Sequence, residues 1–238
     1  MIKEIIDKLV ALLAVSALLA SCSESELWQN PQTEARDGYI MLNFKTEIPA
    51  MQEVVTRAVD PDGGGVQDMT LFCFDSYGLF ISTVKAGVTV QKPGPGEMEG
   101  TFKAEVPENT RTIHFLANQN MDEFKEDSFR NKSESEVMAV LEGSSGRMIY
   151  WGRFACDAGN DSNIAEQMAT SGNSVKLIRN HARISVDNPD NNGHIVITGF
   201  AVCNTNAFGT VAPHHPKKGF DFTWPSSDDP FVPLPVND

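Results

Sequence analysis

Short apolar runs with a two-residue period recur along this chain, and clusters of glycine, proline, asparagine and aspartate separate them. In residues 39–46, the side chains of Ile40, Leu42 and Phe44 share one side, and residues 101–106 alternate in the same way. A period of two places successive side chains on opposite faces of a β-strand. We therefore expect an all-β fold, a β-sandwich of about seven short strands with a small helical insertion.

Other apolar runs predict the remaining strands, at residues 69–75, 79–91, 112–118, 174–187 and 194–204, with a short apolar segment at 148–152. The last two long runs flank a turn sequence at 188–193, which predicts a long antiparallel hairpin. One helix is predicted from Ser133 to Leu141. Ser133 and Glu136 have the spacing of a capping box, and Gly143 is placed to end the helix. Residues 157–172 are predicted to form a polar loop.

The N-terminus carries the pattern of an exported lipoprotein. The apolar run from Leu9 to Ala20 has 12 residues, whereas a membrane-spanning helix needs roughly 20. Its end, Leu19-Ala20-Ser21-Cys22, has a small residue before a cysteine. We predict that residues 1–21 are a signal peptide and that Cys22 is lipidated and becomes the mature N-terminus. Residues 22–36, which begin with alternating serine and glutamate after Cys22, are predicted to be a polar tether.

Composition and patterning divide the rest of the chain. Residues 37–213 contain the strand patterns and are predicted to be one domain. Residues 214–238 are rich in proline and acids, which indicates a linker or the truncated start of a second domain. The formal net charge of −13, from 32 acids against 19 bases, argues against nucleic acid as a partner.

Four cysteines are present, and Cys22 is assigned to lipid. Cys73, Cys156 and Cys203 have no close spacing, so we predict neither an essential disulfide nor a metal site, and no cofactor. Cys73 and Cys203 lie inside apolar strand patterns and are expected to be small core residues.

The sequence also lacks the motifs of common enzymes. His114 and His181 lie in predicted strands and are expected to be outward-facing or satisfied in the core, and His214-His215 lie in the tail. No Ser/His pattern, phosphate-binding glycine loop or zinc-protease motif is present, so we predict a non-catalytic protein. A hydrolase would require a Ser/His/Asp cluster that only the fold can bring together. Trp151 is expected to pack in the core beside Tyr150.

Several short strings follow one another in a set order and spacing. They are Leu19–Cys22, Val55–Ala58, Leu71–Asp75 followed by Gly78, Ile113–Asn118, Tyr150–Gly152, Leu177–Ile184 and Gly199–Thr205, with Gly209 and Pro213 at the end. In this order and spacing they resemble the fimbrillin family, the fimbrial subunits and accessory lipoproteins of Bacteroides-like anaerobes. The resemblance spans roughly residues 37–213. It implies a transthyretin-like β-sandwich as an N-terminal domain.

The resemblance further implies surface display at the outer membrane through lipid on Cys22, followed by cleavage by a trypsin-like protease. Mapped onto this chain, cleavage falls between Arg57 and Ala58 and releases the strand at residues 38–48. The implied partners are other fimbrial subunits, one of which donates a strand to the vacated site. The chain departs from the family by ending soon after the first domain. The alternative reading is a monomeric surface lipoprotein that binds a glycan or a host protein.

Overall fold

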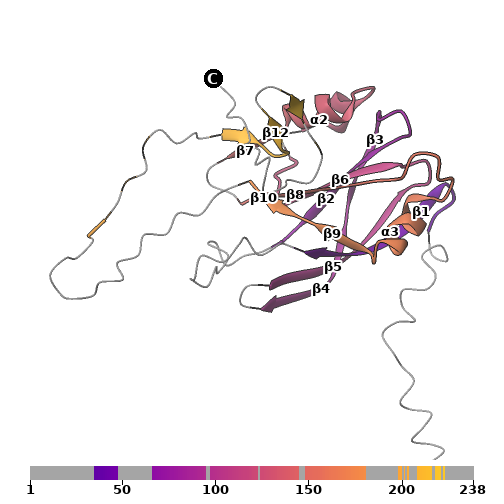
Figure 1. Ribbon diagram of the computed structural model, residues 1–238, viewed down its shortest axis with the longest axis horizontal. Helices are drawn as coiled ribbons and strands as arrows, with labels where there is room; N and C mark the ends of the chain where they lie inside the picture. Colours follow the sequence, from indigo (N-terminus) through magenta and orange to yellow (C-terminus); the bar gives the residue numbers. More distant parts are fainter. Residues whose placement is uncertain are drawn as a thin grey trace, which may run out of the picture. The chain divides into compact units, whose positions relative to one another are not determined.

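The structure is a computed structural model of the whole chain (Figure 1). It describes residues 35–47, 66–94, 97–122, 124–144, 148–180, 198–199, 201, 203, 208–215, 218–220 and 222. The lipoprotein signal, Cys22, Arg57, Ala58 and most of the predicted hairpin at 174–204 lie outside these ranges.

Two β-sheets make up the body of the described chain, which confirms the predicted all-β sandwich with a small helical insertion. The four-stranded sheet has the order β4 (Gly87–Gly94), β5 (Glu97–Pro107), β1 (Tyr39–Glu47), β9 (Ser174–Lys176). The five-stranded sheet has the order β10 (Ile178–Arg179), β8 (Tyr150–Ala155), β6 (Thr112–Ala117), β2 (Met69–Phe74), β3 (Phe80–Lys85). Every pairing within them is antiparallel except that of β1 with β9.

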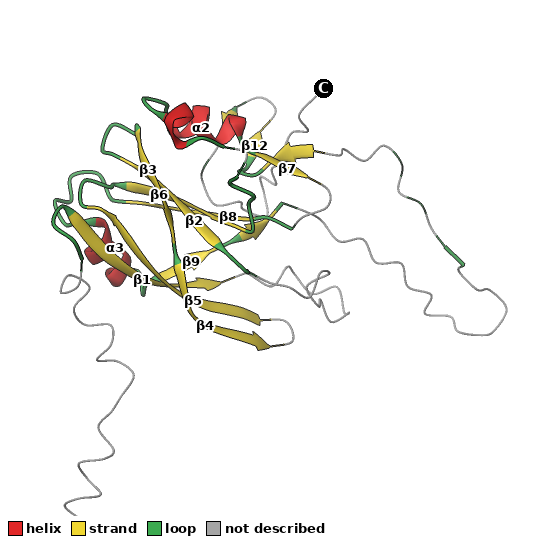
Figure 2. Cartoon of the chain, turned by 180° about the vertical axis from the view of Figure 1, so that it is seen from behind, coloured by secondary structure: helices red, strands yellow, loops and turns green. Residues whose placement is uncertain are grey.

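Apolar side chains from the facing sides of the two sheets form the main core. The rings of Phe44 in β1 and Phe115 in β6 make a T-shaped contact at 5.0 Å between centroids, which joins the four-stranded sheet to the five-stranded one. The helix α3 (Ile164–Thr170) adds Ile164, Ala165 and Met168 to the same core. It lies beside β1 in both views (Figures 1 and 2).

A second core covers the outer side of the five-stranded sheet. The helix α2 (Glu134–Val140), the 3₁₀ helix η2 (Glu126–Phe129) and the pairs β7 (Glu142–Ser144) with β11 (Phe208–Thr210) and β12 (His214–His215) with β13 (Gly219–Phe220) surround it. Figure 2 shows α2 on the side of this sheet away from β1. Because β2 and β6 are covered on both sides, all their residues are buried. Phe220 and Phe222 also pack on this core, and the predicted domain boundary at residue 213 stays a prediction.

The capping box of the predicted helix is confirmed: the Ser133 hydroxyl accepts from the Glu136 amide, and the Glu136 carboxylate accepts from the Ser133 amide. The predicted loop at 157–172 is wrong in part, because it contains α3. Asn163 caps this helix by accepting from the Glu166 amide at 3.0 Å. Tertiary burial of one short apolar face stabilises this helix, which is only seven residues long.

Two predicted strands are each divided between the two sheets. Residues 79–91 form β3 and β4, with the chain turning at Ala86, whose amide donates to the Met69 carbonyl at 2.9 Å. The described part of 174–187 forms β9 and β10, separated by Leu177. Apolar residues continue through the second crossing, from Val175 and Leu177 in the main core to Ile178, which packs on the second core. The apolar run therefore does not reveal the change of sheet.

Gly152 of β8 makes this second crossing possible, since a Cβ atom there would lie 2.6 Å from the Lys176 carbonyl oxygen and 2.8 Å from Leu177 Cδ2. We expect Gly152→Ala to lower the free energy of unfolding by about 1–3 kcal/mol, because backbone has to move to accommodate the methyl group. Urea unfolding measures the change. The matched control is Gly87→Ala, because a Cβ atom at Gly87 would meet only the Lys103 carbonyl oxygen at 3.8 Å, and we expect a much smaller effect. Gly159→Ala is unsuitable, because Gly159 has φ +80° and alanine would be strained there.

Candidate functional site

The strand β1 fills a groove between β5, β9 and the five-stranded sheet, and we call this the β1 groove. Buried side chains of β1 alternate with exposed or half-buried ones. The four that point into the groove are those of Ile40, Leu42, Phe44 and Thr46. Phe44 is fully buried, stacked on Phe102 of β5 at 5.5 Å with an interplanar angle of 17°. This segment is therefore part of the folded core, as the sequence alternation predicts.

The two neighbours of β1 pair with it over unequal lengths. β5 pairs along β1 from Tyr39 to Thr46, whereas β9 pairs only from Lys45 to Glu47. The Lys45 amide donates to the Asn173 carbonyl at 2.7 Å, and the Glu47 carbonyl accepts from the Leu177 amide at 2.7 Å. Because peptide groups alternate along a strand, Met41 and Asn43 direct theirs to this same edge. Among the described residues, no strand pairs with that edge at these two positions.

A clamp joins the start of β1 to β5. Glu105 of β5 accepts from the Arg36 amide at 2.6 Å and from Arg36 Nε at 2.7 Å, and the guanidinium lies 4.4 Å from the ring centroid of Tyr39. The backbone hydrogen bond from Arg36, together with its guanidinium, holds the pKa of Glu105 below its usual 4.5. Arg36 is 69% exposed, so solvent screens the pair and its contribution to stability is small.

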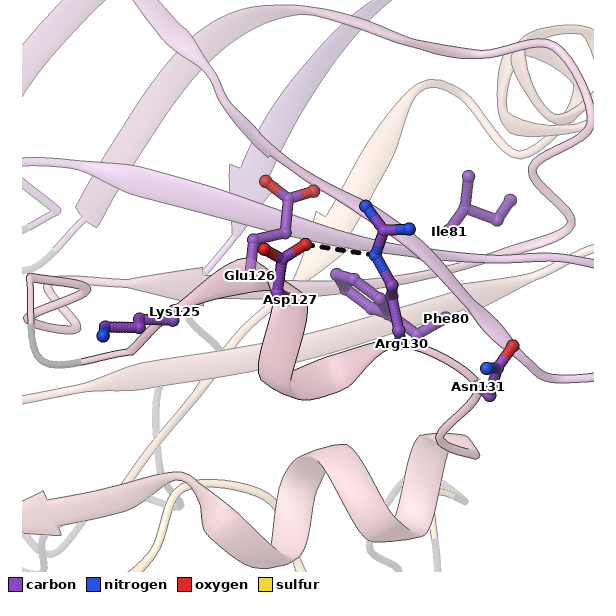
Figure 3. A pocket seen from close by; sticks show the side chains of 7 residues that line it. All are labelled: Phe80, Ile81, Lys125, Glu126, Asp127, Arg130 and Asn131. Carbon is purple, nitrogen blue, oxygen red and sulfur yellow. Dashed lines mark hydrogen bonds and ion pairs between the residues drawn. The ribbon is translucent and has the colours of Figure 1, made fainter.

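The β3 edge of the five-stranded sheet is covered by residues of and next to η2. The Phe80 amide of β3 donates to the Lys132 carbonyl at 2.9 Å, and the Thr83 amide donates to Glu126 Oε1 at 3.0 Å. Beside this cover is a surface hollow of about 780 Å³, lined by Phe80, Ile81, Lys125, Glu126, Asp127, Arg130 and Asn131 (Figure 3). Blocked amides on an edge strand prevent another chain from adding to it.

His114 has partners on both ring nitrogens. Trp151 Nε1 donates to His114 Nδ1 at 3.1 Å, and since an indole can only donate, Nδ1 is the acceptor. His114 Nε2 therefore carries the proton and donates to Glu134 Oε2 at 2.7 Å. Burial lowers the pKa of His114, and Glu134 opposes this only in part. An imidazole with both nitrogens engaged has no lone pair left to act as a general base.

Glu134 also binds Arg153, through Nε at 2.7 Å and a second bond at 3.2 Å. Burial alone would raise the pKa of Glu134, but the hydrogen bonds from His114 and Arg153 outweigh it and lower the pKa to about 2. Phe222 closes over the cluster, with its ring 4.7 Å from that of His114. The arrangement fits a half-buried structural ion pair, and the non-catalytic character of the chain stays a prediction.

The other residues singled out from the sequence have mixed outcomes. Trp151 and Tyr150 are both buried, but they lie in different cores on opposite faces of β8. Cys73 is buried as predicted, and burial raises the pKa of its thiol to about 12. Cys203 is exposed, so its predicted place in the core is wrong. No sequence pattern pointed to Arg36 or Glu105, because alternation predicts the face of a strand and not its cross-strand partner.

Within the described ranges, no three histidine, cysteine or acidic side chains are grouped to hold a metal ion. In the same part of the chain, no helix has the length and apolar character required to cross a membrane.

Comparisons with known proteins give one structural likeness. No family model matches the chain, and no curated protein is found to be similar to it. Among solved structures, it is similar to a fimbrial assembly protein from Parabacteroides distasonis ATCC 8503, determined at 2.38 Å resolution. The two chains are 12% identical with a TM-score of 0.42, over 84% of this chain and 79% of the other.

Proposed function

We propose that this protein is a structural or adhesive subunit, or an accessory component, of a cell-surface fimbria. It is exported as a lipoprotein, held at the outer membrane by lipid on Cys22, and assembled by strand exchange. In this scheme a trypsin-like protease cuts between Arg57 and Ala58, β1 leaves, and a strand from another fimbrial subunit takes its place in the β1 groove.

The observation that carries the proposal is the position of β1. It is the first strand of the described chain, and residues 48–68 join it to β2. One cut in that connection breaks the covalent link between β1 and the strands that follow it. Between Tyr39 and Phe44, β5 is the one described strand that pairs with β1, so in this stretch departure of β1 breaks that ladder alone among those described. Its inward side chains are buried, so its loss would open an apolar groove along a sheet edge.

The free energy gained by burying the side chains of β1 indicates that the groove does not stay empty. Burying Ile40, Leu42 and Phe44 stabilises the fold by roughly 1.5–3 kcal/mol each, or about 5–9 kcal/mol together. The whole free energy of unfolding of a domain is about 5–15 kcal/mol. A chain without β1 would therefore be close to unfolding. The incoming strand has to enter as β1 leaves, and main-chain pairing with β5 supplies the template for it.

Cleavage of the purified mature chain tests the proposal. With a trypsin-like protease we expect a new N-terminus at Ala58, release of the β1 fragment, and a ladder of oligomers on size-exclusion chromatography and electron microscopy. Arg57→Gln is expected to remain monomeric. Arg130→Gln is the matched control, because it makes the same change at an exposed arginine that lies in the cover of β3, away from β1.

Polymers that form equally from Arg57→Gln would contradict the assigned cleavage site. A chain that is cut at Ala58 yet keeps its β1 fragment and stays monomeric would contradict strand exchange. Binding of that monomer to a glycan array or to a host protein would then favour the monomeric surface lipoprotein.

A further inference from the structure

The four inward positions of the β1 groove differ in how well β1 satisfies them. Ile40 and Leu42 place aliphatic side chains against the main core, with 5% and 1% of their surface exposed. Phe44 places an aromatic ring, and Thr46 places a hydroxyl, and both residues are fully buried. The first three are apolar groups in apolar surroundings, whereas the fourth brings a polar group into the core.

The Phe44 site is built for an aromatic ring. Phe102, its cross-strand partner on β5, stacks on one side at 5.5 Å, and Phe115 of the facing sheet meets it edge-on at 5.0 Å. An aliphatic side chain at this position would lose both ring contacts, and a small one would leave a cavity between the sheets. A strand that enters the groove therefore gains most from an aromatic residue at this point.

The Thr46 site is the one that β1 fills poorly. Thr46 Oγ1 is buried and makes no hydrogen bond with any described residue. A buried hydroxyl without a partner has lost its hydrogen bonds to water and gained none in return. Valine has nearly the same shape without the hydroxyl. A strand with valine or isoleucine here would keep the packing and avoid that loss.

The direction of an entering strand follows from the longer ladder. β5 offers antiparallel pairing along Tyr39 to Thr46, and β9 offers parallel pairing only along Lys45 to Glu47. Antiparallel pairs are slightly more stable for each residue than parallel ones. A strand that runs as β1 does keeps antiparallel pairs over the longer ladder, so that direction is favoured.

We propose that the natural occupant which displaces β1 is an extended segment of another polypeptide that runs in the direction of β1, places an aromatic ring at the Phe44 site and places a β-branched aliphatic side chain at the Thr46 site. This inference rests on the proposed function and names the chemistry of its partner. β1 then acts as a placeholder whose buried hydroxyl makes it the weaker occupant, and exchange runs downhill when the better strand arrives.

Peptide exchange on the full mature chain tests the inference. A specific protease site is engineered into residues 48–65, so that the cut does not depend on Arg57. Peptides with the sequence of residues 38–48 are added, and native mass spectrometry and fluorescence anisotropy follow displacement of the resident strand. We expect Thr46→Val in the peptide to tighten binding about tenfold. Phe44→Ala is expected to weaken it at least about 100-fold, and the reversed sequence to bind no better than Phe44→Ala.

The peptide control is Asn43→Ser, which changes an outward side chain and is expected to bind as the unsubstituted peptide does. In the chain itself, Thr46→Val is expected to slow release of the resident strand. Equal binding of the Thr46→Val and unsubstituted peptides overturns the placeholder, and equal binding of Phe44→Ala overturns the aromatic site. In both cases exchange itself still occurs, so the proposed function stands. Failure of every peptide to exchange, the unsubstituted one included, overturns both.

Discussion

Phe44→Ala is expected to lower the free energy of unfolding by about 3–5 kcal/mol, a large part of the stability of a domain of this kind. The ring is fully buried, stacks on Phe102 and meets Phe115 edge-on, so truncation removes apolar burial and two aromatic contacts together. Phe102 and Phe115 belong to different sheets, and a collapse that fills the cavity would have to bring the sheets closer. Urea denaturation followed by tryptophan fluorescence gives the change.

Met41→Ala is the matched control, since Met41 lies three residues away on the same strand and is only half-buried on the outward face. We expect a loss there well below that of Phe44→Ala. Amide exchange should also rise in β1 and β5 of Phe44→Ala more than in β2 and β6, because the weakened strand opens locally before the domain unfolds. A loss below about 1 kcal/mol for Phe44→Ala would show that β1 contributes little to the core, and would remove the physical basis of the β1 groove.

The sequence predicted those parts of the fold that depend on neighbours along the chain. The alternation of Ile40, Leu42 and Phe44 gave the buried face of β1, and the spacing of Ser133 and Glu136 gave the start of α2. The helix α3 was missed because polar turn residues surround its short apolar face. The changes of sheet at Ala86 and Leu177 were missed because apolar residues continue across both points, so the strand-like sequence shows no break there.

Partners distant in sequence could not be predicted in the same way. His114 lies on the outer face of β6, which a single sheet would leave to solvent, and it is buried because α2, Phe222 and the other elements of the second core cover that face. Its partners come from α2 and β8, 20 and 37 residues further along the chain. Thr46 likewise continues the alternation of β1, and nothing local distinguishes a buried hydroxyl with a partner from one without.

The strand β6 contributes side chains both to the second core and to the wall of the β1 groove. Phe115 points into the main core against Phe44, and its neighbour His114 points into the second core against Trp151 and Glu134. The proposed strand exchange would require the five-stranded sheet to stay intact while the β1 groove is open. The ion pair of Glu134 with Arg153, the fixed imidazole of His114 and the aromatic rings of the second core lie on the other face of that sheet, so the proposed exchange would leave them in place.

This far-side cluster predicts that acid destabilises the fold in two steps. Burial lowers the pKa of His114 in the folded chain. As the pH falls below 6.5, the imidazole is therefore protonated in the unfolded chain while it is still neutral in the folded chain, and the free energy of unfolding decreases. Glu134 has a folded pKa of about 2 against 4.5 when unperturbed, so its contribution is complete above pH 4.5 and is lost between pH 4.5 and pH 2. That second loss is on the order of 3 kcal/mol.

Glu134→Gln separates this carboxylate from the other acids. Glutamine cannot ionise, so at pH 7 the variant is expected to be less stable than the parent by about 3 kcal/mol, since Arg153 loses its charged partner. The gap should close as the pH falls from 4.5 towards 2, because the parent then becomes neutral at the same position.

Glu105 and Glu136 also have lowered pKa values and affect both proteins equally. Glu108→Gln, in the exposed turn after β5, serves as the control and should leave the curve unchanged. Urea unfolding at a series of pH values measures the gap, and a gap that stays constant down to pH 3 would mean that the charge of Glu134 does not hold this face of the sandwich together.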